Sequence, residues 1–506
     1  MSPGARVGAD LVALAAGLLV PLGFAPFGWF PLPIIGLALA LATWLAAGPR
    51  RAFWRGWLFG VGQFGFGVGW VHISIHQFGG NSLPVALAIA FALVAYLALF
   101  PALLALLVAW IRRRAGAAWR VVLLLAAGWV LLEWLRGWLL TGFPWLALGI
   151  SQIDTPLAAL APVAGTLAVG FAAAGSAGLL WAMARPGGAA GGRGAALLLL
   201  VALWGGLAAW GGRDWTEPAG EPFRVTLVQG NITQDRKWLP EELEATLTLY
   251  RSLSEAGWSS RLVLWPETAV PVFYETVAEG YLDELQAVSR LTATDVLLGI
   301  PYRDAATDRY YNAMLAITDA GRAFYFKRQL VPFGEFLPLR GLLGETLRFL
   351  NVPLGDFSRG PADQRPLRLA GQPVGITICY EDVFSAVLRR QLPEATLLVN
   401  VSNDAWFGDS IAPHQHLQIA RMRALETGRV LLRGTNTGIS AIIGPRGEIL
   451  ARSPQFAVDV LHGTVEPRRG ATPYVAVGDG PVLGLALLLA LLAFAGRAPP
   501  VGWRHA

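Results

Sequence analysis

Cys379, Lys327 and Glu267 each follow a short apolar segment in this chain of 506 residues. The segments are PVGITI before the cysteine, AFYF before the lysine, and LVLW with one proline before the glutamate. Short apolar runs bounded by turn residues, with β-branched or aromatic members, predict β-strands. Because the carboxyl ends of strands form the ligand crevice of an α/β sheet, we expect the three side chains to converge at one edge.

The single cysteine has two interpretations. A thiol at a strand-to-helix turn faces the helix amides and the positive end of the helix dipole, which favour the thiolate. Most free cysteines, however, are small buried hydrophobic residues. Cys379 cannot form an intramolecular disulfide, since it has no partner. Taken alone, the residue leaves nucleophile and core position equally open.

Lysine is nearly absent: of 40 basic residues only Lys237 and Lys327 are lysines. Where any positive charge would serve, this chain uses arginine. A retained lysine therefore indicates a place that needs a compact ammonium and cannot take a planar guanidinium. The alternative is a chance surface residue, and we give that interpretation to Lys237, in QDRKW.

The three residue types can together form a covalent acyl intermediate. A carboxylate partly screened from water can take the thiol proton as general base, and the thiolate can attack a carbonyl carbon. The ammonium, with a backbone amide near the cysteine, can stabilise the resulting oxyanion. We expect Glu267 to be the base, Lys327 the oxyanion stabiliser and Cys379 the nucleophile, with no metal and no cofactor.

The composition indicates a membrane protein, because 54% hydrophobic residues and only 15% charged residues are unusual for a soluble domain. Long apolar blocks fill the first part of the chain, and a helix needs roughly 20 such residues to cross a bilayer. We expect eight spans, near residues 8–23, 31–48, 54–74, 83–111, 119–140, 155–184, 194–211 and 481–496.

Arginines predict the orientation of these spans. They follow every second span, at Arg50, Arg51, Arg55, Arg112, Arg113, Arg114, Arg120, Arg185, Arg193, Arg497 and Arg504. The loops after the third and fifth spans carry none and one, Arg136. Positive-inside bias then places both termini in the cytoplasm. These arginines explain much of the net charge of +6, so we expect no nucleic-acid partner.

The chain is expected to divide into three parts. Residues 1–212 form a membrane domain of about seven transmembrane helices, 213–478 an extracytoplasmic catalytic domain, and 479–506 a final transmembrane helix and cytoplasmic tail. The middle part alternates predicted strands with stretches of helical spacing, which predicts one α/β domain with a buried sheet. We expect strands at 223–229, 261–265, 295–300, 323–326, 373–378, 396–402, 429–434 and 439–444, and helices at 240–253, 381–392 and 414–428.

The motifs resemble a known superfamily. WPET, FKRQLVPFGE and CYED follow the Glu-Lys-Cys order of the nitrilase, or carbon–nitrogen hydrolase, superfamily, whose domain is an αββα sandwich. The apolar spans, LVQGNITQDRKW, TGFPWLALG and NVSNDAWFGDSIAPHQHLQIARMRALETGR are similar to the bacterial apolipoprotein N-acyltransferase family. The resemblance covers essentially the whole chain.

The resemblance implies an activity and a place in the cell. Such enzymes pass an acyl chain from a phospholipid, chiefly phosphatidylethanolamine, through a cysteine thioester to the N-terminal amine of a diacylglyceryl-cysteine apolipoprotein. It implies a multi-pass protein of the bacterial inner membrane with a periplasmic catalytic domain. It assigns the triad to Glu267, Lys327 and Cys379. It gives supporting or substrate-binding roles to Trp238, Glu335, Tyr380 and Glu381.

Other features leave alternatives open. Residues 333–355 are partly apolar and proline-containing, so they could be a mobile lid or an ordinary long loop. Glu133 and Arg136 could pair on one helical face. His72 and His76 are interpreted as hydrogen-bonding histidines at the outer interface, because a third metal ligand is missing from the motif.

Two rival classes share some of these features. A membrane-tethered amidase would use the same triad but release its acyl group to water. A transporter would use the α/β part as a binding module, but Glu133 and Arg136 are too few and too peripheral for an ion path.

Overall fold

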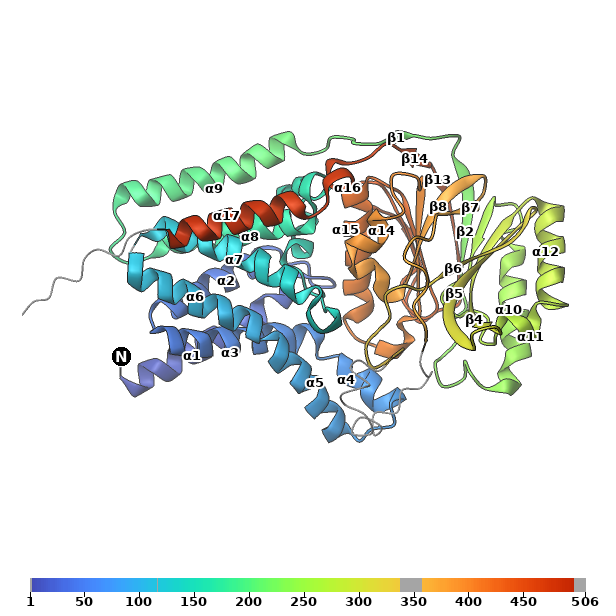
Figure 1. The fold of residues 1–506 in the computed structure, drawn as a ribbon, viewed down its shortest axis with the longest axis horizontal. Helices are drawn as coiled ribbons and strands as arrows, with labels where there is room; N and C mark the ends of the chain where they lie inside the picture. Colours follow the sequence, from blue (N-terminus) through green and yellow to red (C-terminus); the bar gives the residue numbers. More distant parts are fainter. Residues whose placement is uncertain (1, 116, 337–356, 496–506) are drawn as a thin grey trace, which may run out of the picture. The chain divides into compact units, whose positions relative to one another are not determined.

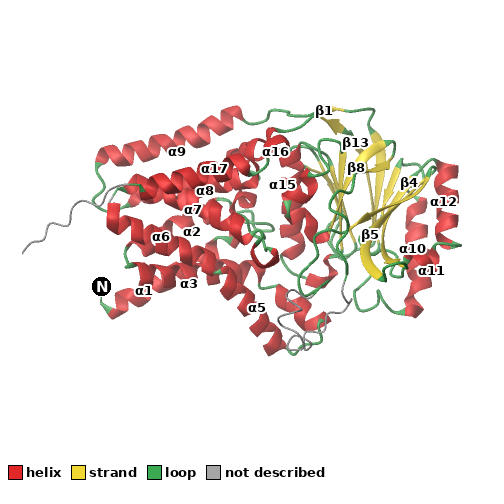
Figure 2. Ribbon diagram, in the orientation of Figure 1, coloured by secondary structure: helices red, strands yellow, loops and turns green. Residues whose placement is uncertain are grey.

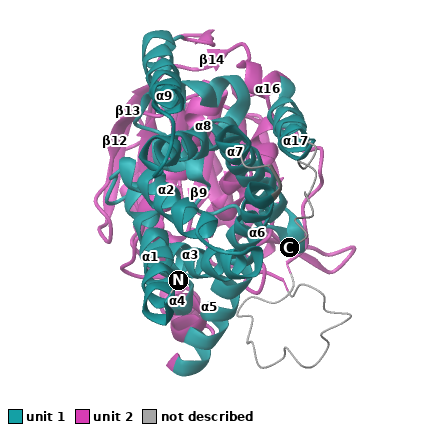
Figure 3. Ribbon diagram, turned by 90° about the vertical axis from the view of Figure 1, so that its left-hand side faces the viewer, with its two compact units in different colours: residues 1–72, 84–213, 477–506 teal, residues 73–83, 214–476 magenta. Residues whose placement is uncertain are grey.

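The computed structural model describes residues 2–115, 117–336 and 357–495. Residues 333–355, which the sequence leaves open as a lid or an ordinary loop, fall outside the described residues except for 333–336. The chain forms two compact units: residues 1–72, 84–213 and 477–506 make the first, and residues 73–83 and 214–476 make the second (Figure 3).

The first unit is helical (Figure 1). Its main helices are α1 (Pro3–Leu19), α2 (Pro31–Leu45), α3 (Pro49–Val68), α5 (Leu83–Leu97), α6 (Leu99–Ala115), α7 (Ala118–Arg136), α8 (Ala161–Ala184), α9 (Ala190–Trp210) and α17 (Gly480–Phe494).

Among the described residues, five helical stretches are long and apolar enough to cross a membrane. A sixth is obtained if α3 and Val71–Phe78, bent by 58° to each other, count as one span. The apolar helices α2 and α17 are shorter. Long apolar helices therefore occur where the sequence predicts spans, although α2 and α17 are shorter than expected.

Arg55, one of the arginines counted after the second span, is buried inside a helix. Arg55 is inside α3, only 1% exposed, and its Nε donates to Asp10 Oδ1 at 2.9 Å. A buried guanidinium needs such a partner, because an unpaired charge inside apolar surroundings is costly. Arg55 is therefore a packing residue as well as a basic one.

The second unit contains the strands (Figure 2). They are β1 (Glu217–Pro218), β2 (Phe223–Gln229), β3 (Leu262–Leu264), β4 (Asp295–Asp304), β5 (Arg309–Thr318), β6 (Gly321–Phe326), β7 (Leu367–Leu369), β8 (Gln372–Ile378), β9 (Leu397–Ser402), β10 (Leu431–Thr435), β11 (Ala441–Ile443), β12 (Ile449–Arg452), β13 (Asp459–Val465) and β14 (Arg468–Arg469).

Two six-stranded sheets form the centre of this unit within the described residues. Their orders are β13-β2-β3-β4-β5-β6 and β12-β11-β10-β9-β8-β7. Strands β2, β3 and β4 are parallel neighbours in the first sheet, as are β8, β9 and β10 in the second. Apolar side chains of both sheets make a common core, including Leu227, Leu264, Ile376 and Val399.

Helices cover the outer faces of the two sheets. They are α10 (Leu243–Glu255), α11 (Tyr274–Val277) and α12 (Tyr281–Thr292) on the first sheet, and α14 (Ser385–Arg389) and α15 (Ala412–Thr427) on the second. A short helix, α16 (Pro473–Val477), follows the last strand. This is an αββα sandwich, so the predicted fold class is confirmed. The single buried sheet expected from strand patterns alone is wrong, because the core lies between two sheets.

Most predicted elements have counterparts in the structure, and two differences matter for the site. The helix predicted at 381–392 is reduced to a 3₁₀ turn, Cys379–Val383, and the five-residue α14. Strand β5, which the sequence did not predict, lies between β4 and β6 in the first sheet.

Candidate active site

The three predicted catalytic residues follow strands that belong to different sheets. Glu267 comes after β3 and Lys327 after β6 in the first sheet, whereas Cys379 comes after β8 in the second. Because β4, β5 and β6 are successively antiparallel, β6 runs in the same direction as β3. The side chains therefore meet across the sandwich rather than along one sheet edge, which corrects the expectation of a single edge.

Glu267 is 7% exposed and has hydrogen-bond partners at both carboxylate oxygens. Its Oε1 accepts from Asn312 Nδ2 at 2.7 Å and lies 3.4 Å from Lys327 Nζ. Its Oε2 accepts from the backbone N–H of Asn403 at 2.9 Å. These contacts fix the orientation of the carboxylate, and Asn312 on the unpredicted β5 supplies one of them.

The backbone around Glu267 is packed closely against β4. A Cβ atom added at Gly299 would lie 2.3 Å from the backbone nitrogen of Thr268 and 2.5 Å from the carbonyl oxygen of Pro266. No side chain fits in that space, so glycine is required at this position. Thr268 itself has a φ of +51°, a conformation that is uncommon outside glycine.

Lys327 is 1% exposed and lies between two carboxylates. Its Nζ is 2.8 Å from Glu335 Oε1 and 3.4 Å from Glu267 Oε1. Burial lowers the pKa of Lys327, but the two carboxylates outweigh this effect and hold the pKa above its usual value. The residue therefore stays an ammonium at any physiological pH. Glu335, which the resemblance marks as a supporting residue, directly contacts it.

Cys379 opens the 3₁₀ turn with a φ of +52°. This left-handed conformation is unfavourable for a residue with a side chain and is typically found at functional sites. The sulfur of the partly buried thiol lies 3.4 Å from Ser402 Oγ. Burial and the negative charge of Glu267 raise the pKa of the thiol, although Lys327 lowers it.

The raised thiol pKa contradicts the expectation of a thiolate stabilised by a helix dipole. The dipole argument needs a helix after the cysteine, but only a single 3₁₀ turn follows. A dipole of that length is small, and the nearby carboxylates oppose ionisation. The resting group is thus a thiol that requires a base.

Glu381 connects the lysine turn to the cysteine turn. Its Oε1 accepts from the backbone N–H groups of Arg328 at 2.6 Å and Gln329 at 3.1 Å. Its Oε2 accepts from Ile378 N at 2.8 Å and from the hydroxyl of Tyr325 at 3.0 Å. Burial raises the pKa of Glu381, while the backbone donors lower it. One carboxylate therefore positions the residues next to both Lys327 and Cys379.

A buried ionic cluster next to Cys379 was not predicted. Asp382, Asp404, His416 and Arg433 are each 0 to 1% exposed. His416 contacts Asp382 at 2.9 Å and Asp404 at 3.1 Å, and Arg433 contacts Asp404 at 3.0 Å. The cluster reaches the cysteine through His416, whose Nε2 is 3.3 Å from the carbonyl oxygen of Cys379.

Opposite charges control the ionisation of this cluster. Burial and Arg433 lower the pKa of His416, but the carboxylates of Asp382 and Asp404 outweigh them and raise it to about 9. Burial raises the pKa of Asp404, but Arg433 and His416 hold it well below its usual range. His416 and Arg433 thus both lie against the carboxylates of Asp382 and Asp404. His416 is therefore part of a buried ionic network, and the sequence carries no sign of its ionic partners.

Lys237 is not a surface residue, and the interpretation of it as a chance survivor is wrong. Its side chain is 3% exposed, and its Nζ donates to the backbone carbonyl oxygen of Glu267 at 3.1 Å.

The next residue, Trp238, is 37% exposed. Tyr380 is 7% exposed and stacks edge-on against Phe384. Roles for Trp238 and Tyr380 in the reaction stay predictions.

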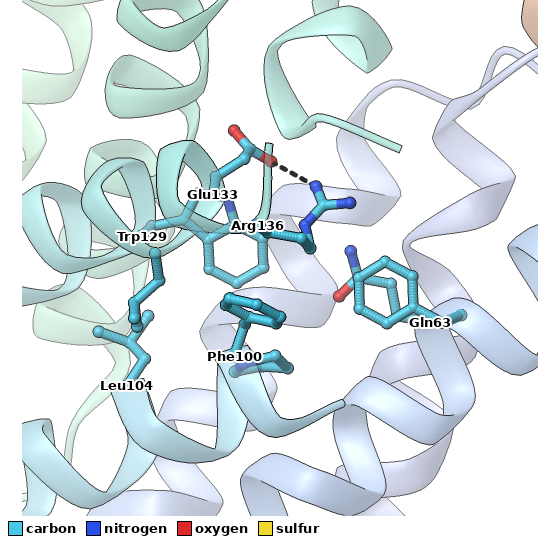
Figure 4. Close-up of a pocket in the computed structure, with 9 residues that line it drawn as sticks. Gln63, Phe100, Leu104, Trp129, Glu133 and Arg136 are labelled. Carbon is cyan, nitrogen blue, oxygen red and sulfur yellow. Dashed lines mark hydrogen bonds and ion pairs between the residues drawn. The ribbon is translucent and has the colours of Figure 1, made fainter. Parts of the chain in front are cut away.

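The first unit has a separate polar group, which lines a small pocket (Figure 4). Glu133 and Arg136 point into this region from α7 and pair at 3.5 Å, as their spacing predicts. Arg136 also donates to the carbonyl oxygens of Phe143 and Trp145, and Glu133 accepts from Leu148 N. The pair therefore holds the TGFPWLALG segment in place.

His72 and His76, which lie in the short helical segment after α3, each form a hydrogen bond with a backbone carbonyl oxygen. His72 Nδ1 lies 2.6 Å from the oxygen of Gly69, and His76 Nδ1 lies 2.7 Å from that of Asn81. These contacts agree with the expectation of hydrogen-bonding histidines.

Known protein families match both the helical part and the two-sheet part of this chain. Residues 16–179 match the model of the apolipoprotein N-acyltransferase N-terminal domain, and residues 224–474 match that of the carbon–nitrogen hydrolase domain. The protein is therefore a carbon–nitrogen hydrolase domain combined with membrane helices.

Two relatives cover nearly the whole chain. The apolipoprotein N-acyltransferase of Methylococcus capsulatus is 48% identical over 97% of this chain and 96% of its own length. That of Nitrosomonas europaea is 45% identical over 96% of this chain and 98% of its own. This chain belongs to the apolipoprotein N-acyltransferase family. The crystal structure of the Caenorhabditis elegans NitFhit protein also matches, with 17% identity, 53% of this chain and 65% of that chain covered, and a TM-score of 0.40.

Proposed function

We propose that this protein transfers a fatty acyl chain from a membrane phospholipid to the N-terminal amine of diacylglyceryl apolipoproteins, by way of a thioester on Cys379. The observation that carries the mechanism is the meeting of a thiol, a carboxylate and a buried ammonium across the two sheets. Membership of the family supports the acyltransferase activity. The triad, the donor and the order of steps are our inference.

In the first half-reaction the enzyme becomes acylated. Glu267 takes the proton of the Cys379 thiol, and the thiolate attacks the ester carbonyl of the phospholipid. The ammonium of Lys327 and a backbone amide near the cysteine stabilise the oxyanion. The carbon–oxygen bond then breaks, the proton on Glu267 passes to the leaving oxygen, and a lysophospholipid departs.

The second half-reaction releases the acyl chain as an amide. The α-amino group of the apolipoprotein attacks the thioester carbonyl, and the same donors stabilise the new oxyanion. Glu267 takes a proton from the attacking nitrogen. The carbon–sulfur bond breaks, and the sulfur regains that proton to restore the thiol.

The supporting residues account for the rigidity that such a site needs. Glu335 holds the Lys327 ammonium, and Glu381 fixes the turns that carry Lys327 and Cys379. The resemblance suggests that Trp238 and Tyr380 contact substrate. Partial exposure of the Trp238 ring agrees with a residue that meets a ligand.

The expected location follows from the chemistry of the substrates and from the arginine pattern. Donor and acceptor are both lipid-anchored, so their enzyme benefits from membrane helices in the same chain. We propose that it resides in the bacterial inner membrane with the catalytic domain, residues 213–478, on the periplasmic side. Phosphatidylethanolamine is the proposed main donor.

Intact mass spectrometry of the full chain tests the proposal. After incubation with dioleoylphosphatidylethanolamine in detergent micelles, we expect a mass increase of one oleoyl group that hydroxylamine removes, as expected for a thioester. Cys379→Ala and Cys379→Ser should carry no such adduct and should not acylate a lipopeptide. Lipopeptide acylation by the alanine variant would exclude the covalent mechanism. An adduct that water hydrolyses, but that the amine of the lipopeptide does not remove, would indicate an amidase.

A further inference from the structure

Both lysines of the chain contact the same glutamate. Lys327 approaches the Glu267 carboxylate at 3.4 Å, and Lys237 donates to the Glu267 backbone carbonyl at 3.1 Å. The chain carries 40 basic residues, and every one outside this pair is an arginine. Since both of these rare lysines contact Glu267, Lys237 belongs to the same site as Lys327.

Stability alone does not explain a lysine at position 237. The side chain is 3% exposed, and burying an ammonium is unfavourable unless it is well paired. Burial lowers the pKa of Lys237 to about 8, although the charge of Glu267 raises it. Burial therefore disfavours the charged form. An apolar residue of equal length would avoid this cost, as replacements of other buried charges have shown.

The segment that carries Lys237 holds Glu267 from two directions. The ammonium binds the carbonyl of Glu267. Gln234, three residues earlier, accepts from Asn403 Nδ2 at 2.7 Å, and Asn403 N donates to Glu267 Oε2 at 2.9 Å. The backbone N–H of Lys237 donates to Thr233 at 3.1 Å, which closes the segment into a turn.

We propose that Lys237 is a positioning residue for the acyl-transfer reaction, which fixes the backbone of Glu267 and places a second positive charge beside this base. The inference rests on the proposed function, in which Glu267 accepts the thiol proton. The other ionisable groups that meet there are Lys327, with Glu335 behind it, and Cys379.

The second charge has a kinetic consequence. A nearby cation favours the ionised carboxylate, which is the form that can accept a proton. Removing the charge should therefore move the acidic limb of the acylation rate to higher pH. A purely structural residue would lower the amount of active enzyme without moving that limb.

The test compares Lys237→Met, Lys237→Arg and the control Arg236→Met. Arg236 is the neighbouring basic residue, with a side chain 61% exposed and paired with Glu242. Single-turnover acylation of Cys379 by dioleoylphosphatidylethanolamine is followed by intact mass from pH 5 to 8 in the full chain. Thermal unfolding of each variant is recorded under the same conditions.

For Lys237→Met we expect a maximal rate at least tenfold lower and an acidic midpoint about one pH unit higher. The phospholipid concentration at half-saturation should not change, and the melting temperature should be equal or higher. Lys237→Arg should keep the wild-type midpoint, because a guanidinium retains the charge. Arg236→Met should match the wild type throughout.

Each other result overturns the inference. A Lys237→Met enzyme with wild-type rate and midpoint would show that the lysine is dispensable. A slower enzyme with an unshifted midpoint and a lower melting temperature would make Lys237 a structural residue only. The midpoint does not depend on the fraction of folded enzyme, so partial misfolding cannot hide the answer. Absence of any adduct in the wild type would instead refute the proposed function, and this inference with it.

Discussion

Lys327 lies between two carboxylates, in a space that suits a compact ammonium group. Its Nζ is 2.8 Å from Glu335 and 3.4 Å from Glu267, and its side chain is 1% exposed. A guanidinium is broader, planar and directional, so it cannot occupy this space without moving one of the carboxylates.

We therefore predict that Lys327→Arg is nearly as inactive as Lys327→Ala. Loss of one oxyanion donor typically lowers turnover about 100- to 1000-fold. Single-turnover acylation of Cys379 measures this loss, and phospholipid half-saturation should change far less. An arginine variant within about tenfold of the wild-type rate, roughly 1.4 kcal/mol in barrier, would mean that Lys327 supplies only diffuse charge.

His416 should make stability depend on pH. Its folded pKa of about 9 exceeds the unfolded value of about 6.5. Its contribution is therefore complete below pH 6.5 and is lost as pH rises through 9, with a size of roughly 3 kcal/mol at most. Melting temperatures of the wild type should fall between pH 6.5 and 9, and His416→Gln should lack most of this decline. Equal slopes in both proteins would contradict the ionic assignment.

Single residues show what the sequence could and could not reveal. The positions of Glu267, Lys327 and Cys379 at strand ends were readable, because strand periodicity and turn residues are local signals. The burial of Lys237 and the partners of His416 depend on residues far away in the chain. The scarcity of lysine is the one available signal for Lys237, and it is equally compatible with a surface residue.

Among the elements, the turns that follow β6 and β8 are joined by one carboxylate. Glu381 accepts from three backbone N–H groups and one hydroxyl. An amide in its place would present two donors toward groups that are donors themselves, and unmet buried hydrogen bonds are costly.

We predict that Glu381→Gln destabilises the second unit by about 2 kcal/mol or more and slows acylation at least tenfold. Tyr325→Phe is the matched control, because it removes the hydroxyl bond to the same carboxylate, keeps its backbone contacts and should cost about 1 kcal/mol. Chemical denaturation and single-turnover acylation provide the two readouts. Equal effects of the two substitutions would show that the backbone contacts of Glu381 contribute nothing beyond those of Tyr325.

The element after Cys379 shows why local patterns were insufficient there. Residues 381–392 have helical spacing, yet the chain forms a 3₁₀ turn and only five residues of α-helix, Ser385–Arg389. Glu381 and Asp382 have buried partners that hold the first residues in the turn. Tertiary contacts thus override the local preference, and the thiol faces carboxylates instead of a long helix dipole.

For the whole molecule, the proposed mechanism requires one cysteine to serve two large lipid substrates in turn. The proposed mechanism predicts ping-pong kinetics, with acyl-enzyme accumulating when phospholipid is present without apolipoprotein. Initial rates at several concentrations of each substrate should give parallel double-reciprocal lines. Intersecting lines, together with no detectable thioester, would indicate direct transfer between the two lipids.

The general architecture was readable from the sequence because its signals are long and repeated. Apolar blocks predict membrane helices, and short apolar runs with turn residues predict the strands. Pairing of those strands into two sheets was not readable from periodicity, since each sheet joins segments far apart in the chain, such as β13 and β2. Only the resemblance to the carbon–nitrogen hydrolase superfamily indicates the αββα arrangement.

Residues 73–83 belong to the second unit although they are encoded between the membrane helices α3 and α5. Ser74 Oγ donates to the carbonyl oxygen of Trp406 at 2.5 Å, and the ring of Phe78 packs against that of Trp406 at 5.2 Å. During synthesis this segment leaves the ribosome before residues 84–213, and its partner Trp406 is made much later. A fragment of residues 214–476 produced alone would therefore lack a piece of its own surface, which a separate peptide would have to supply.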